Sequence, residues 1–219
     1  MNFAISHYWT QSDDVGRSVV VVLALMSLLS WTVILAKFWM LWRVRRTARL
    51  LPTFWLAPSW DDGMQLLQRG DREKIYLTLA ADAACSADPA FYANTFSADT
   101  SATQTVMRVL RTSLQALTAR LELGLTFLAS VGSTAPFVGL LGTVWGIHHA
   151  LTALAASGTV QIDQLVGPVG EALIMTAFGL MVAIPAVLAY NALQRAVRIT
   201  LAELDGFAHD LHAHFSQPA

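Results

Sequence analysis

Three polar side chains stand out because they fall within long apolar stretches of the chain. Glu171 is the only acidic residue between Gln164 and Glu203, and Thr143 and Thr176 place hydroxyl groups in two different apolar runs. Polar groups at membrane depth are costly to bury, and they commonly face a bundle interior or a water path. The chemistry that these residue types suggest is proton movement along a polar pore, so Thr143, Glu171 and Thr176 are the candidate proton-pathway residues.

Each of the three also has a purely structural explanation. A carboxylate such as Glu171 in the first turn of a helix is favoured by the helix dipole and reached by headgroup water. A threonine hydroxyl in a membrane helix commonly donates to its own i−4 carbonyl. Thr143 and Thr176 lie at depths that differ by about 5 Å in antiparallel spans, which allows a shared polar level. Glu171 and Thr176 are about 140° apart around one helix, so they do not both point at one axis.

The distribution of charge identifies the class of protein. Only 14 Lys/Arg and 15 Asp/Glu occur in 219 residues, 13% of the chain, and hydrophobic residues make up 55%; soluble domains are about 25% charged. Residues 18–36, 123–162 and 172–194 carry no charge at all. This pattern excludes a soluble enzyme domain, a disordered chain and a disulfide-stapled secreted domain. The net charge of −1 argues against a nucleic-acid partner.

Each charge-free run is long enough for a helix that crosses the ~30 Å hydrocarbon core. We therefore expect an all-α membrane protein with three transmembrane helices, at 18–42, 123–156 and 170–194. Lys37, near the end of the first span, is expected to extend its ammonium group toward the lipid headgroups.

Arginines indicate the orientation, because basic residues concentrate on the cytoplasmic side. Several arginines follow the first span, precede the second and follow the third, whereas the loop 157–169 has none. We expect residues 1–17 and this loop to lie outside, and 43–122 and the C-terminal tail 195–219 to lie in the cytoplasm.

The cytoplasmic region is expected to be helical, with helices 2 and 3 extending into it. Ser59 is a candidate helix N-cap, and Asp88–Pro89 marks a break. The sequence predicts one unbroken helix from about Ala102 to Ala155, roughly 80 Å long. Its cytoplasmic half carries an apolar stripe that needs a partner, either in the same chain or in another subunit. The stripe consists of Val106, Val109, Leu110, Leu114, Leu117 and Leu121.

Small residues and prolines in the spans predict close helix packing. Gly139, Gly142 and Gly146 follow one another at three- and four-residue intervals in the second span, a spacing that permits close approach of a neighbouring helix. Pro136 and Pro185 remove backbone hydrogen bonds within the second and third spans.

Other reactive residue types form no recognisable catalytic or metal-binding pattern. His148 and His149 are adjacent, so they point about 100° apart and do not form a shared metal pair; an interfacial polar role is expected. The single Cys85 is expected to pack between helices. No nucleotide-binding loop, zinc spacing or serine-hydrolase signature is present in the sequence. We expect no enzymatic activity, no cofactor and no bound metal.

Two long motifs resemble the ExbB/TolQ/MotA proton-channel family. Residues 132–147, Gly-Ser-Thr-Ala-Pro-Phe-Val-Gly-Leu-Leu-Gly-Thr-Val-Trp-Gly-Ile, resemble that family's second span, and residues 171–191, EALIMTAFGLMVAIPAVLAYN, resemble its third. The Ser-Thr-Ala-Pro form is closer to the ExbB branch than to the TolQ branch, and the chain has one span too few for MotA.

The resemblance implies a subunit of the bacterial inner membrane, with a periplasmic N-terminus and a cytoplasmic C-terminus, that forms a homopentameric ring in the lipid. Spans two and three would line a pore holding the single helix of an ExbD-type partner, and Thr143, Glu171 and Thr176 match the family's polar pore residues. The complex would use proton flow to energise a TonB-type transducer, which drives import of iron complexes and vitamin B12 across the outer membrane. The alternatives are a TolQ-like subunit of the Tol-Pal cell-envelope system and a non-conducting membrane scaffold.

Overall fold

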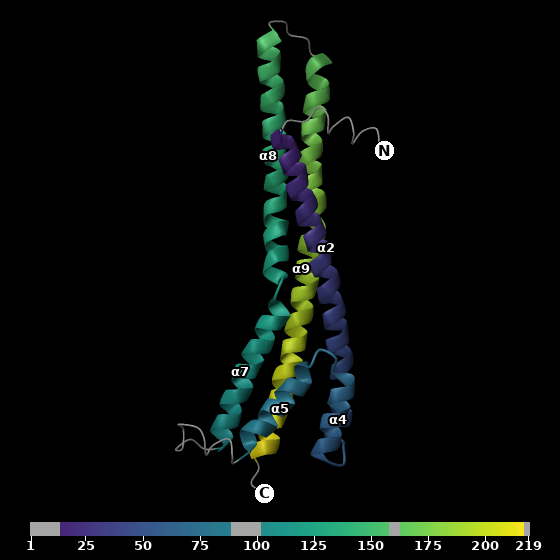
Figure 1. The fold of residues 1–219 in the computed structure, drawn as a ribbon, viewed down its shortest axis with the longest axis vertical. Helices are drawn as coiled ribbons and strands as arrows, with labels where there is room; N and C mark the ends of the chain where they lie inside the picture. The colour runs from purple at the N-terminus through teal and green to yellow at the C-terminus, as the bar shows by residue number, and fades with distance from the viewer. Residues whose placement is uncertain (1–13, 89–101, 158–162, 217–219) are drawn as a thin grey trace. The chain divides into compact units, whose positions relative to one another are not determined.

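In the computed structural model, residues 14–88, 102–157 and 163–216 are described, and every element in these ranges is an α-helix (Figure 1). This confirms the all-helical fold expected from the sequence. The helices, in chain order, are α2 (Asp14–Ala48), α3 (Leu51–Trp55), α4 (Trp60–Gly70), α5 (Ile75–Ala87), α7 (Ala102–Glu122), α8 (Leu125–Ser157) and α9 (Asp163–Ser216).

Three helical stretches are long and apolar enough to cross a membrane: Asp14–Trp55, Thr103–Ala156 and Val166–Ser216. They carry large apolar side chains that the rest of the chain leaves exposed, such as Phe137 at 70% and Met181 at 64%. Faces of this kind suit contact with lipid or with other membrane helices, because lipid imposes no hydrophobic penalty on them. The expected three long apolar helices are therefore present.

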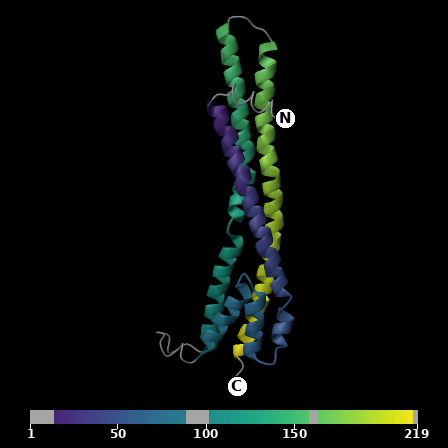
Figure 2. The ribbon, with the colours of Figure 1, turned by 45° about the vertical axis from the view of Figure 1, so that its right-hand side comes forward.

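The chain divides into two compact units, and α2 and α9 contribute to both. One unit contains the described residues up to Leu35 together with Gly124–Ala192. In it, the N-terminal part of α2 lies beside α8 and α9 (Figures 1 and 2). Its core combines branched and small side chains, which lets three helices approach closely. The core residues are Val19, Leu23, Val131, Ala135, Met175, Ala183 and Ala186.

The second unit contains Ala36–Leu123 and the chain from Leu193 onward. Here α5 packs against α7, and the apolar stripe of α7 is buried at Val106, Leu110, Leu117 and Leu121. The apolar stripe therefore has a partner in the same chain, which was one of the two possibilities that the sequence left open.

An aromatic cluster joins the C-terminal end of α9 to α3 and α4 within this second unit. Phe54 of α3 packs edge-on against Trp60 and Phe207, with ring centroids 5.5 and 5.6 Å apart. His214 stacks on Trp60 at 5.6 Å. Aromatic pairs in these geometries add to the stabilisation from burial. The C-terminal tail therefore continues α9 as a packed helix as far as Ser216, in agreement with a third helix that extends beyond its span.

Two local caps define the helices of the second unit. The Ser59 hydroxyl accepts a hydrogen bond from the Asp62 N–H at the start of α4, which confirms the expected N-cap. Lys74, with φ of 53°, connects α4 to α5, and Asp71 Oδ2 accepts from the Leu77 N–H at 2.9 Å. The Asp71 carboxylate, 2% exposed, therefore caps α5 from a buried position.

The expected single helix from Ala102 to Ala155 is interrupted, and that prediction was wrong. A turn at residues 123–124 separates α7 from α8, and Gly124 has φ of 87°. Glycine adopts this left-handed conformation without the clash of a Cβ atom. The Lys37 ammonium group donates to the carbonyl oxygens of Arg120 and Leu121, at 2.9 and 3.0 Å. Lys37 is thus 9% exposed and binds the end of α7, instead of extending outward as expected.

The third long helix begins earlier than the sequence suggested. α9 starts at Asp163, so Pro168 lies inside it, as does Pro185; α8 continues through Pro136 in the same way. The loop expected at 157–169 is thereby shortened, and its residues 158–162 lie outside the described ranges, as do most of residues 1–17 and Pro89.

Asp71→Asn should reduce the change in melting temperature between pH 4 and pH 7. Burial raises the pKa of the Asp71 carboxyl above its usual range, although the N–H groups at the start of α5 act in the opposite direction. The folded protein therefore holds the Asp71 proton more tightly than the unfolded chain does. This contribution to stability is fully present below the unfolded-state pKa, near 3.9, and is lost as pH rises through the folded-state pKa.

Thermal unfolding of the detergent-solubilised protein at both pH values measures this effect. The asparagine keeps a carbonyl acceptor for the Leu77 N–H and does not titrate. It therefore removes only the pH-dependent part of the contribution that Asp71 makes to stability. Asp61→Asn, at an exposed position in α4, is the matched control and should behave as the parent protein. If Asp71→Asn shows the same difference in melting temperature between pH 4 and pH 7 as the parent protein, the Asp71 carboxyl is not the source of that difference.

Candidate functional site

The candidate site lies where α8 and α9 face each other at the level of Thr143 and Thr176. The two hydroxyl groups are hydrogen-bonded to each other. The Thr143 oxygen also lies 3.1 Å from the Ala172 carbonyl oxygen on α9 and 3.2 Å from the Gly139 carbonyl oxygen on its own helix. The structure thus combines the i−4 contact with a contact between the two spans. Thr143 is 6% exposed and Thr176 is half-buried.

A close approach of the two helix backbones places these hydroxyls within reach of each other. A Cβ atom on Gly139 would lie 2.6 Å from the Met175 carbonyl oxygen and 3.1 Å from the Gly179 Cα atom. A Cβ atom on Gly179 would lie 2.7 Å from the Ala135 carbonyl oxygen. Only glycine fits at both positions without a shift of backbone, because real Cβ atoms do not approach backbone this closely.

The other two glycines of the motif face partner helices of the same unit. A Cβ on Gly142 would lie 3.0 Å from a Val19 methyl group of α2 and 3.2 Å from the Met175 Cβ. A Cβ on Gly146 would lie 3.0 Å from the Ala172 Cβ. These contacts are tight. The Val19 methyl group can move aside, whereas the Cβ atoms of Met175 and Ala172 are fixed by the α9 backbone.

Glu171 occupies a different position in its helix from the one expected. Because α9 begins at Asp163, Glu171 lies about two turns inside the helix, not in its first turn. The favourable first-turn dipole interaction therefore does not account for it. The side chain is half-buried and makes no hydrogen bond or ion pair with the described residues. It does not join the pair of threonines, although Ala172, the next residue, supplies the carbonyl near Thr143.

The histidines and the cysteine do not belong to this site. His148 and His149 are exposed on α8, and the His148 ring lies 6.1 Å from the Trp145 ring. Cys85 is an exposed free thiol, so its expected role as a helix-packing residue is wrong; Ala83 and Ser86 are the buried residues on that part of α5. In the part of the chain that the structure describes, no group of three or more His, Cys, Asp or Glu side chains is placed to hold a metal ion.

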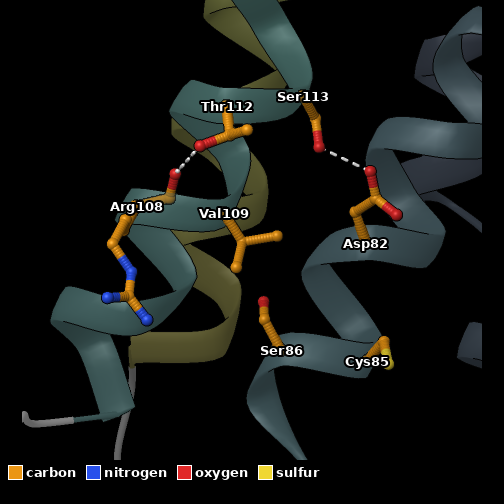
Figure 3. Close-up of a pocket in the computed structure, with 7 residues that line it drawn as sticks. All are labelled: Asp82, Cys85, Ser86, Arg108, Val109, Thr112 and Ser113. Atoms are coloured by element: carbon orange, nitrogen blue, oxygen red, sulfur yellow. Dashed lines mark hydrogen bonds between the residues drawn. The ribbon is translucent and has the colours of Figure 1, made fainter. Parts of the chain in front are cut away.

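A cavity of about 370 Å³ lies between α5 and α7 in the second unit (Figure 3). The Ser113 hydroxyl donates to the Asp82 carboxylate at one end of it. Arg108 of α7 and Cys85 of α5 lie on opposite sides of the cavity and add a cation and a thiol to its lining. Its lining residues are Asp82, Cys85, Ser86, Arg108, Val109, Thr112 and Ser113. Since Asp82 balances Arg108, the cavity has no strong preference for either charge.

Sequence reasoning missed three contributors to the helix arrangement. Gly179, which contacts Gly139, can be recognised in the sequence as a glycine within the third span, eight residues after Glu171. Gly124 is also visible as a glycine, but its left-handed conformation is not. The Ala172 carbonyl oxygen near Thr143 has no residue-type signal, because every residue has a backbone carbonyl.

Comparison with known proteins identifies a family. The MotA/TolQ/ExbB proton channel family matches residues 82–205, more than half of the chain. The biopolymer transport protein ExbB of Xanthomonas campestris pv. campestris strain B100 is 40% identical over 203 residues, covering 90% of this chain and 80% of that protein. ExbB of Neisseria gonorrhoeae is 55% identical over 103 residues, 47% of each chain. The Tol-Pal system protein TolQ of Haemophilus influenzae is 32% identical over 200 residues, covering 89% and 85%.

Gly139→Ala should destabilise the helix contact that holds the two hydroxyls together. The added methyl group overlaps the Met175 carbonyl oxygen, so α8 and α9 must separate, at a cost of roughly 1–3 kcal/mol. We expect a lower melting temperature in detergent. Gly170→Ala is the matched control on α9, because a Cβ there meets nothing within 4 Å of the same chain. Equal melting temperatures for Gly139→Ala and the parent protein would contradict the close approach.

Proposed function

Because the chain belongs to the MotA/TolQ/ExbB proton channel family, we propose that this multi-pass membrane protein is the ExbB-type subunit of a proton-driven motor in the bacterial inner membrane. Five copies form a ring around the single membrane helix of an ExbD-type partner. Proton flow through the complex energises a TonB-type transducer for transport across the outer membrane. Residues 1–17 and 157–169 face the periplasm, and residues 43–122 and 195–219 face the cytoplasm.

The hydrogen bond between Thr143 and Thr176 is the observation that carries the proposal. It places two uncharged polar groups at one level of the α8–α9 pair, within otherwise apolar spans. Repeated around a ring, such pairs form a polar lining that solvates an acidic side chain on the partner helix. Protonation of that acid removes a charge that is costly to bury. Gain and loss of the proton then favour different positions of the partner helix in the ring.

Glu171 acts near this level as a second polar group. It is half-buried on α9 and makes no bond to the described residues of its own chain. A carboxylate inside a span is stable when it is paired or hydrated. We assign it either a polar partner across the subunit interface or a place on the proton route.

A higher sequence identity over a match of similar length supports the ExbB-type assignment over the TolQ-type one. The Xanthomonas ExbB is 40% identical over 90% of this chain, whereas the Haemophilus TolQ is 32% identical over 89%. Close helix packing is expected of a non-conducting scaffold and of a proton channel alike, so it does not favour the scaffold.

Thr176→Val should leave the complex assembled and reduce proton-driven transport. Valine has nearly the same shape and lacks the hydroxyl, so packing between α8 and α9 is kept while the polar lining is broken. We expect uptake of a TonB-dependent substrate to fall about tenfold, equal to roughly 1.4 kcal/mol in the barrier. Co-purification with the partner measures assembly, and Thr176→Ser, which keeps the hydroxyl, is the control. Loss of assembly in Thr176→Val would assign the residue to packing instead.

Glu171→Gln should impair transport at normal protein levels, because a side-chain amide neither binds nor releases a proton near neutral pH. The measurement is substrate uptake with and without an uncoupler that dissipates the proton gradient. A scaffold would tolerate the amide and would be insensitive to the uncoupler. Full uncoupler-sensitive uptake in both Glu171→Gln and Glu171→Ala would remove this residue from the mechanism.

A further inference from the structure

The end of α2 presents exposed aromatic side chains directly before exposed arginines. Phe38, Trp39 and Trp42 are 61%, 60% and 49% exposed. One turn further on, Arg45 and Arg46 occupy the last turn of the helix and are also exposed. Arg49, just after the helix, is exposed as well.

Spacing along the helix places the aromatic and basic groups together. Trp39, Trp42 and Arg46 are separated by three and four residues, so they share one face of α2. The Arg46 guanidinium carbon lies 3.9 Å from the centroid of the Trp42 ring. Stacking of this kind uses the flat face of the guanidinium and leaves its N–H groups, which lie in its plane, free to donate. Arg46 is therefore held in place while its hydrogen-bonding groups remain available.

The neighbouring Arg43, on the same helix, has both an aromatic ring and a carboxylate as partners. It lies over the Trp39 ring at 5.5 Å, and its NH1 atom also pairs with Glu73 Oε1 at 3.2 Å. By contrast, Arg45, Arg46 and Arg49 form no ion pair with the residues that the structure describes. Three positive charges are thus left uncompensated at one end of a membrane-crossing helix.

We propose that Trp42, Arg45, Arg46 and Arg49 bind the phosphate headgroup of an anionic phospholipid, with its acyl chains along Phe38 and Trp39. Charge complementarity selects an anionic headgroup, since a guanidinium matches two phosphate oxygens at once. The exposed aromatic residues select a lipid over free phosphate, because only the lipid covers them with apolar surface. The site requires only that α2 crosses a membrane, so it holds whichever side this end faces and does not depend on the proposed motor function.

Titration of the full-length protein in detergent with phosphatidylglycerol tests the site, with bound lipid counted by native mass spectrometry. Phosphatidylcholine of the same chain length is the zwitterionic comparison, and we expect it to bind more weakly. Each arginine near a membrane surface contributes about a fivefold change in affinity, so Arg46→Gln should weaken phosphatidylglycerol about fivefold. The triple variant R45Q/R46Q/R49Q should weaken it on the order of a hundredfold.

The matched control removes three charges from exposed arginines that lack a stacked tryptophan. R69Q/R72Q/R108Q changes the net charge equally and should bind phosphatidylglycerol as the parent protein does. Circular dichroism checks folding; if the triple variant does not fold, Arg46→Gln alone carries the test. Equal weakening by both triple variants would overturn the proposal in favour of net charge. Equal affinity for the two lipids, or displacement of the lipid by an equal concentration of inorganic phosphate, would also overturn it.

Discussion

The close backbone contact of α8 and α9 at Gly139 and Gly179 is the constraint on which the candidate site depends. Without side chains at these two positions, the helices approach until the Gly139 and Gly179 backbones meet. The next turn of each helix then brings the Thr143 and Thr176 hydroxyls into a hydrogen bond. In membrane helices, such contacts between small residues replace the hydrophobic driving force that acts in water. The same contact therefore stabilises the pair and creates its polar level.

Polar groups within the spans differ in how completely the chain satisfies them. Thr143 has acceptors on both helices, whereas Glu171 has no partner among the described residues of its own chain. In an apolar medium, an unsatisfied polar group is costly, and a carboxylate is the most costly of the three. The chain itself thus supplies partners for the threonine hydroxyls, whereas any partner of the Glu171 carboxylate lies outside the described residues.

The sequence predicted those features that depend on residue type and period. The charge-free runs indicated the three long helices, the apolar stripe of α7 indicated its buried face, and Ser59 indicated a cap. What it missed depends on backbone conformation: the left-handed turn at Gly124 and the start of α9 at Asp163, ahead of Pro168. Proline is tolerated in a membrane helix when neighbours satisfy the freed carbonyl groups. For Thr143 and Thr176, the sequence indicated only a similar depth in the membrane. Whether they face each other depends on the rotation of α8 and α9 about their axes, which the glycine contact sets.

A structure of the complex purified with its proposed partner from native membranes would show whether the Thr143 and Thr176 hydroxyls face the partner's acidic residue. The quantity to measure is the distance from the acidic carboxylate of the partner's membrane helix to the Thr143 and Thr176 hydroxyl oxygens. We expect this carboxylate to lie inside the ring at the level of the two threonines, within hydrogen-bond reach directly or through one water. A partner helix outside the ring, or a carboxylate facing a different level of α8 and α9, would contradict this expectation.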